Sequence, residues 1–269
     1  MSARIPVGER HTCAYASLDD ERHFLFGGGD REGSRALASV VEYNSTSQKF
    51  REHPRIPPGG RIYSAATAID DDRLLVVGGY SLKTWDSCLM YDTKSRKWST
   101  DWPSLNARRE HHRCVVNDNN KVYVFGGSNF RDGFLDTIEE LDLLLPTPSW
   151  RVLPQRLDKK LQKHLGYRCA IAHVKNSNNI IVAGGWNNKD KDLRSCEMIC
   201  LDPTQEGETR TLPFMMTPRK EHALVLVENR FVVAIGGTST GYQPIASVEF
   251  LDLEEEPQEE QQWRPLPSL

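Results

Sequence analysis

"VYVFGGSN", residues 122–129, joins a short apolar run to two glycines and then to polar residues. The run is typical of a buried β-strand, and a glycine at its end lets the chain turn out of the sheet. The same phrase occurs five times in all, at intervals of about 50 residues, which indicates a repeat architecture. The glycine pairs are Gly27-Gly28, Gly78-Gly79, Gly126-Gly127, Gly184-Gly185 and Gly236-Gly237.

Each repeat carries the pattern of four short strands. A loop follows the glycine pair, and then comes a third apolar segment that ends in Tyr or Leu followed by Asn or Asp, a residue pair suited to start a turn. A fourth segment opens on a bulky residue, and another apolar segment precedes each diglycine strand. Each repeat is therefore predicted to be a four-stranded meander. The bulky residues are Phe50, Trp98, Trp150, Leu212 and Trp263.

Five sheets that cannot bury their apolar faces alone are expected to pack around an axis as a β-propeller. The diglycine after an apolar strand, the Tyr/Leu-Asp turn and the following Trp resemble kelch repeats over essentially the whole chain. Two repeats depart from this pattern, because the first has Phe50 in place of Trp and the fourth has no Trp there. The resemblance implies an all-β fold, a kelch-type β-propeller of five four-stranded antiparallel blades in one domain, residues 1–269. The expected blades are about 8–53, 58–103, 108–154, 165–213 and 219–266.

The glycines are interpreted as structural, since no GxxxxGK[ST] or GxGxxG phosphate-binding motif is present. Only "LDKKLQKHL", residues 157–165, has a helical pattern. The terminal sequences resemble inter-blade links, and no blade is divided between the two ends. We therefore expect a small ring closed by blade-to-blade packing. The alternative is an open arc that exposes two apolar sheet faces.

Composition narrows the class of protein. Hydrophobic residues make up 38% and charged residues 26% of the chain, and the formal net charge is −3, which argues against a nucleic-acid partner. No apolar run approaches the roughly 20 residues of a membrane span, and no secretory signal is visible. The six cysteines form no CxxC pair, so a reduced protein is expected, with a cytoplasmic or nuclear address and no cofactor.

Chain direction places the inter-blade links and the post-diglycine loops on one face of the propeller, which we call the link face. The opposite turns are short and alike, whereas the post-diglycine loops are longer and differ from one another. Aromatic residues in these loops are predicted contact residues, because aromatics supply large contact areas at a small entropy cost. They are Tyr80, Trp85, Phe130, Trp186 and Tyr242.

The links also carry charge. Segment 151–168 holds six basic residues against one acidic residue, while opposite turns such as residues 70–72 are acidic. This distribution favours an acidic protein or peptide on the link face. An Arg-x-x-His phrase recurs in the links, with either a blade-to-blade packing role or a contact to a ligand. The predicted basic contact residues are Arg61, Arg108, Arg109, His112, Arg168, Arg219 and His222.

Catalysis is less well supported than binding. Neighbouring side chains on a strand face opposite ways, so His111 and His112 cannot chelate one metal, and no metal site is predicted. Glu110 and Glu221 could form an acid–base pair in the central channel of a sugar-type enzyme or binder, which is the alternative function. The preferred prediction is a non-catalytic protein-interaction scaffold. Kelch domains often serve ubiquitin-ligase adaptors, but a BTB or F-box segment is not visible, so that role would need a separate partner.

Overall fold

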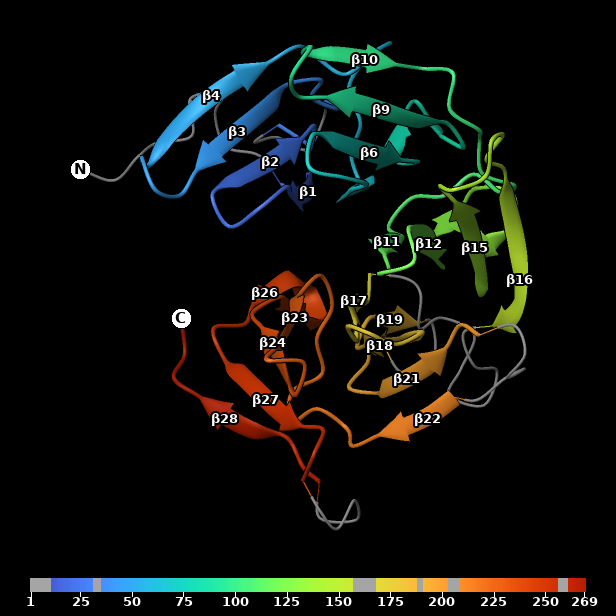
Figure 1. Cartoon of the computed structure of the whole chain (residues 1–269). Coiled ribbons are helices and arrows are strands. Elements are labelled where there is room, and N and C mark those ends of the chain that lie inside the picture. The colour runs from blue at the N-terminus through green and yellow to red at the C-terminus, as the bar shows by residue number, and fades with distance from the viewer. Residues whose placement is uncertain (1–10, 31–34, 157–167, 188–190, 203–208, 256–260) are drawn as a thin grey trace.

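The computed structural model describes residues 11–30, 35–156, 168–187, 191–202, 209–255 and 261–269. Five four-stranded antiparallel sheets stand around a common centre, which confirms the kelch-type propeller (Figure 1). In every blade the chain runs outward from an inner strand to an outer one. Blade 1 comprises β1 (Ala14–Ser17), β2 (Arg22–Phe26), β3 (Val40–Asn44) and β4 (Lys49–His53). Blade 2 comprises β5 (Ala65–Ala68), β6 (Arg73–Val77), β9 (Cys88–Asp92) and β10 (Lys97–Ser99).

The other three blades repeat this order. The strands stay within the expected blade ranges except for β16, which runs two residues further. Blade 3 comprises β11 (Arg113–Val116), β12 (Lys121–Phe125), β15 (Thr137–Asp142) and β16 (Trp150–Arg156). Blade 4 comprises β17 (Ala170–His173), β18 (Asn179–Ala183), β21 (Cys196–Cys200) and β22 (Thr209–Leu212). Blade 5 comprises β23 (Ala223–Val227), β24 (Phe231–Ile235), β27 (Val248–Asp252) and β28 (Arg264–Leu266).

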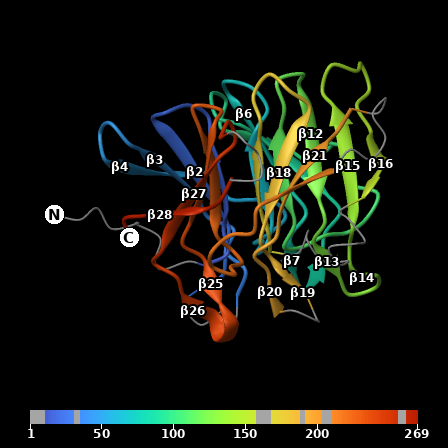
Figure 2. The ribbon, with the colours of Figure 1, turned by 90° about the horizontal axis from the view of Figure 1, so that it is seen from below.

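Four post-diglycine loops form small hairpins on one face of the disc, as Figure 2 shows. Isolated bridges pair link residues with these hairpins, for example Ile62 with Tyr80, so links and loops share a face as the sequence predicted. The hairpins are β7 (Tyr80–Ser81) with β8 (Lys83–Thr84), β13 (Ser128–Asn129) with β14 (Gly133–Phe134), β19 (Trp186–Asn187) with β20 (Lys191–Asp192), and β25 (Thr238–Ser239) with β26 (Gln243–Pro244). A 3₁₀ turn, Thr240–Tyr242, lies inside the last hairpin.

The described part of the chain contains no α-helix, and none of its helices could span a membrane. The predicted helical stretch, residues 157–165, lies outside the described residues.

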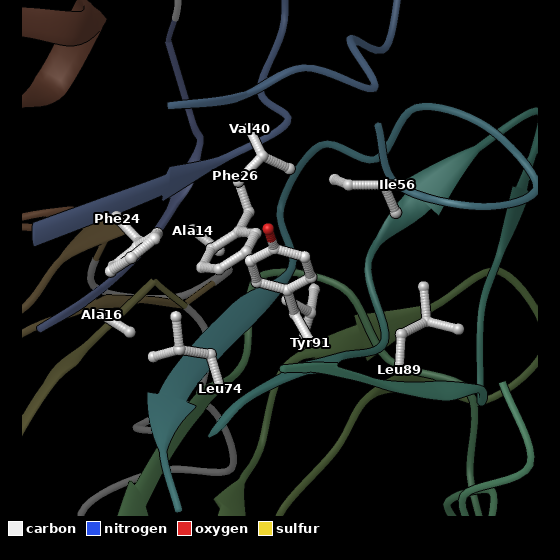
Figure 3. Close-up of a cluster of buried hydrophobic side chains, with 10 residues drawn as sticks. Ala14, Ala16, Phe24, Phe26, Val40, Ile56, Leu74, Leu89 and Tyr91 are labelled. Carbon is white, nitrogen blue, oxygen red and sulfur yellow. The ribbon is translucent and has the colours of Figure 1, made fainter. Parts of the chain in front are cut away.

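The hydrophobic core is divided into four clusters, each between two successive blades. Figure 3 shows the cluster between blades 1 and 2, where Phe24 and Phe26 of β2 meet Leu74 of β6 and Tyr91 of β9. Equivalent clusters join blades 2 and 3, blades 3 and 4, and blades 4 and 5. Because both faces of a middle blade are covered, its second strand is buried on both sides.

The diglycines let neighbouring blades approach. Gly27 has a φ of 61°, and a Cβ atom there would lie 2.2 Å from the carbonyl oxygen of Arg61 in the next blade. The N–H of Gly28 donates a hydrogen bond of 2.8 Å to that same oxygen. Only a residue without a side chain fits this contact. Gly27 and Gly28 therefore have a structural role, as the sequence predicted: they let the link of the next blade pack closely.

The fourth-strand tryptophans fix the links. The indole N–H of Trp98 donates to the Pro54 carbonyl at 3.0 Å, and Trp150 and Trp263 make the same bond to Pro103 and Pro213. A buried tryptophan needs such a partner for its N–H. This repeated bond explains why a bulky residue recurs at the start of the fourth strand.

The ring is open, which corrects the expected closure. Inner strands of successive blades pack together from β1 and β5 through to β17 and β23, but β23 and β1 do not pack in this way. No apolar cluster of described residues joins blade 5 to blade 1. Figure 1 shows these two blades at the ends of an arc, with both chain termini on that side. The sequence of blade 5 is as apolar as that of any other blade, so it gave no sign of the opening.

Candidate functional site

One residue from every blade adopts the left-handed conformation just before the inner strand. The φ values lie between 54° and 57°, a region uncommon for residues other than glycine. Such strained positions persist where the surrounding structure imposes them, and they gather at functional sites. We call this set the αL column: Thr12, Tyr63, His111, Arg168 and Glu221.

Backbone hydrogen bonds hold the column in place. The N–H of Tyr63 donates to the carbonyl of Thr12 at 3.1 Å, and the N–H of His111 donates to the carbonyl of Tyr63 at 3.0 Å. The ladder continues from Arg168 to His111 at 3.2 Å and from Glu221 to Arg168 at 2.9 Å. Each bond satisfies a polar group at the crowded centre of the propeller. The ladder therefore imposes one backbone conformation on five chemically different side chains.

These side chains surround a pocket of about 410 Å³ near the centre of the link face, which we call the mouth pocket. Its size falls within the range of ordinary ligand sites, roughly 300–1,000 Å³. The pocket is lined by the αL column together with His11, Cys13, Ser64, Arg113, Gly237 and Thr238.

Arg168 is the central charge of the mouth pocket. One guanidinium nitrogen, Nη1, lies 3.1 Å from the Glu221 carboxylate and donates to the Tyr242 hydroxyl at 3.1 Å. Its Cζ atom also lies 5.5 Å from the centre of the Tyr242 ring, within cation–π range. The Arg168 side chain is 11% exposed. A cation that is only partly solvated acts more strongly on a ligand charge than a fully hydrated one.

The wall beside Arg168 is neutral, and its His111 Nε2 lies 3.5 Å from Nη2 of Arg168. The rings of Tyr63 and His111 are stacked, with centroids 3.6 Å apart. Burial, together with the positive charge of Arg168, lowers the pKa of His111 to about 2. His111 is therefore uncharged at neutral pH and is a poor general base. Burial raises the pKa of the neighbouring Glu110 above its usual value.

A second pocket of about 290 Å³ adjoins the first, and we call it the side pocket. Arg168 lines both pockets, and Tyr242 stands beside it. The Lys220 ammonium bonds Asp192 at 2.5 Å and lies 5.1 Å from the Tyr242 ring centre. The side pocket is lined by Arg168, Trp186, Lys191, Asp192, Lys220, Gly241 and Tyr242.

Three of the predicted contact residues meet at these pockets: Arg168, Trp186 and Tyr242. The other predicted aromatics line neither pocket. Tyr80 and Phe130 are exposed, and Trp85 lies beneath Lys83, whose ammonium is 4.2 Å from the ring centre.

The repeated arginines are not surface contacts, which corrects that part of the predicted site. Arg61, Arg109 and Arg219 are at most 1% exposed, and each donates to the carbonyl of a diglycine in its own blade. Arg109 and Arg219 also pair with Glu139 and Glu249. The packing role, which the sequence left open, is the one these side chains perform.

The repeated histidines are buried as well. His112 is 0% and His222 is 4% exposed, and their rings lie against Gly78 and Gly184. Neither can touch a partner directly. Arg108 remains at the surface, where it pairs with Asp86 at 3.4 Å.

The sequence interpretation missed Thr12 and Tyr63, and it considered His111 and Glu221 only for metal binding and catalysis. The Arg-x-x-His phrase was predicted to contribute contact residues because it repeats, but its arginines and histidines pack between blades. The variable position within the repeated phrase lines the pocket. Variation at a fixed position of a repeat is a signal that could have identified the αL column.

Among the described residues, no group of three His, Cys, Asp or Glu side chains could hold a metal ion. The acidic turns on the opposite face are already paired, since Asp19 bonds Arg22 at 2.7 Å and Asp70 bonds Arg73 at 2.5 Å. Most of the basic segment 151–168, residues 157–167, lies outside the described residues. The charged residues that line the pockets are the cations Arg113, Arg168, Lys191 and Lys220 and the carboxylates Glu221 and Asp192.

Comparison with known proteins identifies the family of the chain. Residues 23–246 match the family model described as the Attractin/LZTR1 beta-propeller. Alpha-scruin of Limulus polyphemus is 26% identical over 63% of the chain, and a putative adagio-like protein 2 of Oryza sativa subsp. japonica is 25% identical over 71%. The kelch-like protein terF of Aspergillus terreus is 27% identical over 48%.

These relatives are longer proteins. The matches cover 18% of alpha-scruin and 30% of each of the other two. Among solved structures, YjhT superposes with a TM-score of 0.76 at 15% identity, over 98% of this chain and 86% of that one. An identity this low speaks to the fold alone.

Proposed function

Because this chain belongs to the Attractin/LZTR1 family of kelch-type β-propellers, we propose that it is a protein-interaction module that binds an acidic peptide segment across the link face. The ligand carboxylate enters the mouth pocket, and neighbouring ligand atoms rest on the side pocket. The position of Arg168, which lines both pockets, is the observation on which this proposal depends.

Arginine chemistry suits this role. A guanidinium presents five N–H donors in a plane that matches a carboxylate, and it remains charged at every physiological pH. Nη1 of Arg168 already serves Glu221 and Tyr242, so an incoming carboxylate competes with Glu221. Release of Glu221, whose side chain is 25% exposed, costs less than release of a fully buried partner.

The surrounding residue types fit a protein partner. Binding energy at protein interfaces concentrates on Trp, Tyr and Arg, and the side pocket brings together Trp186, Tyr242 and Arg168. Tyr242 is 62% exposed, so a ligand that covers its ring gains apolar burial. Lys191 adds positive charge beside the Trp186 ring, whereas the charge of Lys220 is balanced by Asp192.

The test is a peptide-display selection against the purified protein, followed by titration of the selected peptides. Arg168→Gln and Tyr242→Ala should each weaken binding by about 10-fold or more, the scale of a lost hot-spot residue. Arg131→Gln is the matched control, because its side chain is 93% exposed and lines neither pocket. Selected peptides whose affinity is unchanged by both pocket substitutions would place binding elsewhere.

A small-molecule function in the channel is the second candidate, and the raised pKa of Glu110 favours it. Perturbed carboxyl groups near a pocket are common at catalytic centres, and Glu110 precedes His111 of the mouth pocket although it lines neither pocket itself. This candidate predicts that a sugar or another small polar compound raises the melting temperature of the protein. Glu110→Gln should then abolish the shift, while peptide binding remains intact.

A further inference from the structure

Two aromatic rings and an excess of positive charge meet in the side pocket. Trp186 and Tyr242 supply the rings, and the described charged residues of its lining are three cations and one carboxylate, which give a net charge of +2. The mouth pocket has two cations and one carboxylate, a net charge of +1 with histidine counted as neutral. The two pockets therefore suit ligand groups of different charge. The charged residues are Arg168, Lys191, Lys220 and Asp192 in the side pocket, and Arg113, Arg168 and Glu221 in the mouth pocket.

The walls of the side pocket are held in place from three blades. The Lys220 and Asp192 side chains are 6% and 4% exposed, and their bond of 2.5 Å joins the link of blade 5 to the β19–β20 hairpin of blade 4. The Trp186 ring lies 5.7 Å, centre to centre, from the ring of Phe134 in blade 3. A pocket whose walls are already fixed costs a ligand less free energy of ordering.

Lys191 is the exposed cation of the side pocket. Its ammonium lies 5.8 Å from the centre of the Trp186 ring. Lys220 pairs with Asp192 and Arg168 pairs with Glu221, whereas no carboxylate in the described part of the chain pairs with Lys191. Lys191 therefore adds a solvated donor beside the more deeply buried guanidinium of Arg168.

The side pocket has the size of a single side chain. Its volume of about 290 Å³ lies just below the range of sites that hold whole small molecules, roughly 300–1,000 Å³. A phosphate monoester carries a charge of about −1.5 to −2 at pH 7, which matches a net charge of +2 better than a carboxylate does. Arginine binds phosphate through parallel N–H groups, and Trp and Tyr rings pack against other aromatic rings. An aromatic ring that bears a phosphate satisfies both kinds of lining residue.

We propose that the side pocket binds a phosphotyrosine side chain of the peptide whose carboxylate enters the mouth pocket. The ring contacts Trp186 and Tyr242, and the phosphate accepts hydrogen bonds from Arg168 and Lys191. The five N–H donors of Arg168 allow it to serve an anion in each pocket. This binding mode rests on the proposed peptide function, and it names the residue that fills the second pocket.

The test compares one peptide in three forms. A library with one fixed phosphotyrosine, and one glutamate at variable spacing from it, is selected on the purified full chain. The selected sequence is then made with tyrosine, phosphoserine or phosphotyrosine at the fixed position. Fluorescence polarisation should show that the phosphotyrosine form binds at least about 10-fold more tightly than either of the others, the scale of one charge-assisted hydrogen bond. Phenyl phosphate should displace it more effectively than AMP, whose ring and phosphate are separated by a ribose.

Substitutions separate the two pockets. Lys191→Gln should weaken the phosphotyrosine form several-fold more than the tyrosine form, and Trp186→Leu should weaken it more than the phosphoserine form. Lys83→Gln is the matched control, because Lys83 opens the second strand of the blade 2 hairpin as Lys191 does in blade 4, yet lines neither pocket. Arg113→Gln alters the mouth pocket alone and should weaken all three forms equally.

The contrary results are distinguishable. Equal affinity of the tyrosine and phosphotyrosine forms, with the dependence on Arg113 retained, would overturn the phosphotyrosine site and leave peptide binding in place. AMP that binds more tightly than the phosphotyrosine peptide would mean that a free nucleotide fills the pocket. Equal effects of Lys83→Gln and Lys191→Gln would place the phosphate elsewhere, and either of these results overturns the proposal. A library that yields no binding peptide would contradict the proposed function as well.

Discussion

The guanidinium of Arg109 and the carboxylate of Glu139 lie 2.5 Å apart, and both side chains are completely buried. Glu139 also accepts hydrogen bonds from the backbone N–H groups of Asn106 and Ala107, at 2.7 and 3.2 Å. This carboxylate therefore holds the link between blades 2 and 3 to the third strand of blade 3. Glu249 does the same in blade 5, where it accepts from Met216 and Thr217 and pairs with Arg219.

Removing one member of this pair should be costly. Glu139→Leu leaves the buried Arg109 cation with only neutral hydrogen-bond acceptors on Gly126 and Thr137, and the free energy of unfolding should fall by about 3–5 kcal/mol. Urea denaturation measures the loss. Arg230→Met is the control, since the Arg230 side chain is 41% exposed where it pairs with Asp252 and its removal should cost much less. A Glu139 variant no less stable than the control would show that the pair does not hold the link.

The diglycines should differ in their tolerance of alanine. Gly78, Gly184 and Gly236 all have positive φ values, so the backbone strain of a new Cβ is common to the three. The Cβ would meet a carbonyl oxygen at 2.7 Å for Gly78 and 2.4 Å for Gly184, but no described residue would come closer than 3.5 Å for Gly236. Gly78→Ala and Gly184→Ala should therefore lose about 1–3 kcal/mol more than Gly236→Ala. Equal losses from thermal or urea unfolding would mean that Gly236 has a neighbour after all.

Glu221 should restrain the binding of an acidic ligand. Its carboxylate lies 3.1 Å from Arg168 and must yield to an incoming carboxylate. Glu221→Gln removes the competing charge, so acidic peptides should bind several-fold more tightly, most clearly at low ionic strength. Fluorescence polarisation with a labelled peptide measures the effect, and Glu228→Gln, at an exposed position of blade 5, is the control. Weaker binding by the Glu221 variant would mean that Glu221 contacts the ligand itself.

Sequence repetition was enough to predict the architecture. The diglycines recur because they allow a link carbonyl of the next blade to approach closely. The fourth-strand tryptophans recur because each hydrogen-bonds a link and holds it in place. Whatever repeats along the chain, including the buried Arg61 and His112, serves this packing. The repeats therefore predicted the blades correctly. The same reasoning failed for the binding site, because the repeated arginines and histidines are buried and cannot contact a partner.

The remaining features depend on contacts between distant parts of the chain. The αL column is created by a ladder between successive blades, and its five side chains share no chemistry that a pattern could reveal. The opening of the ring depends on whether β23 meets β1, residues more than 200 positions apart. Val225 of β23, which is 44% exposed, belongs to a blade of ordinary sequence, and within the described part of the chain only the missing contact with another blade distinguishes it.

Three of the buried histidines should make the fold sensitive to acid. Burial lowers the pKa of His111 to about 2 and the pKa values of His112 and His222 to about 3, so all three stay neutral in the folded protein. In the unfolded chain they take up protons below their ordinary pKa of about 6.5. Their contribution is therefore complete above pH 6.5 and declines as the pH falls toward the folded values, by up to about 1.4 kcal/mol per pH unit for each histidine.

Urea unfolding between about pH 6.5 and 5, above the range of most carboxyl groups, should isolate this dependence. His222→Gln should reduce the slope of the unfolding free energy against pH by about one proton, whatever it does to the stability at pH 7. Met215→Leu alters the same contact at Gly184 without removing a titrating group, so it should leave the slope unchanged. If the slope stays the same in the His222 variant, His222 must already be protonated in the folded state. The prediction that burial keeps this ring neutral would then be wrong.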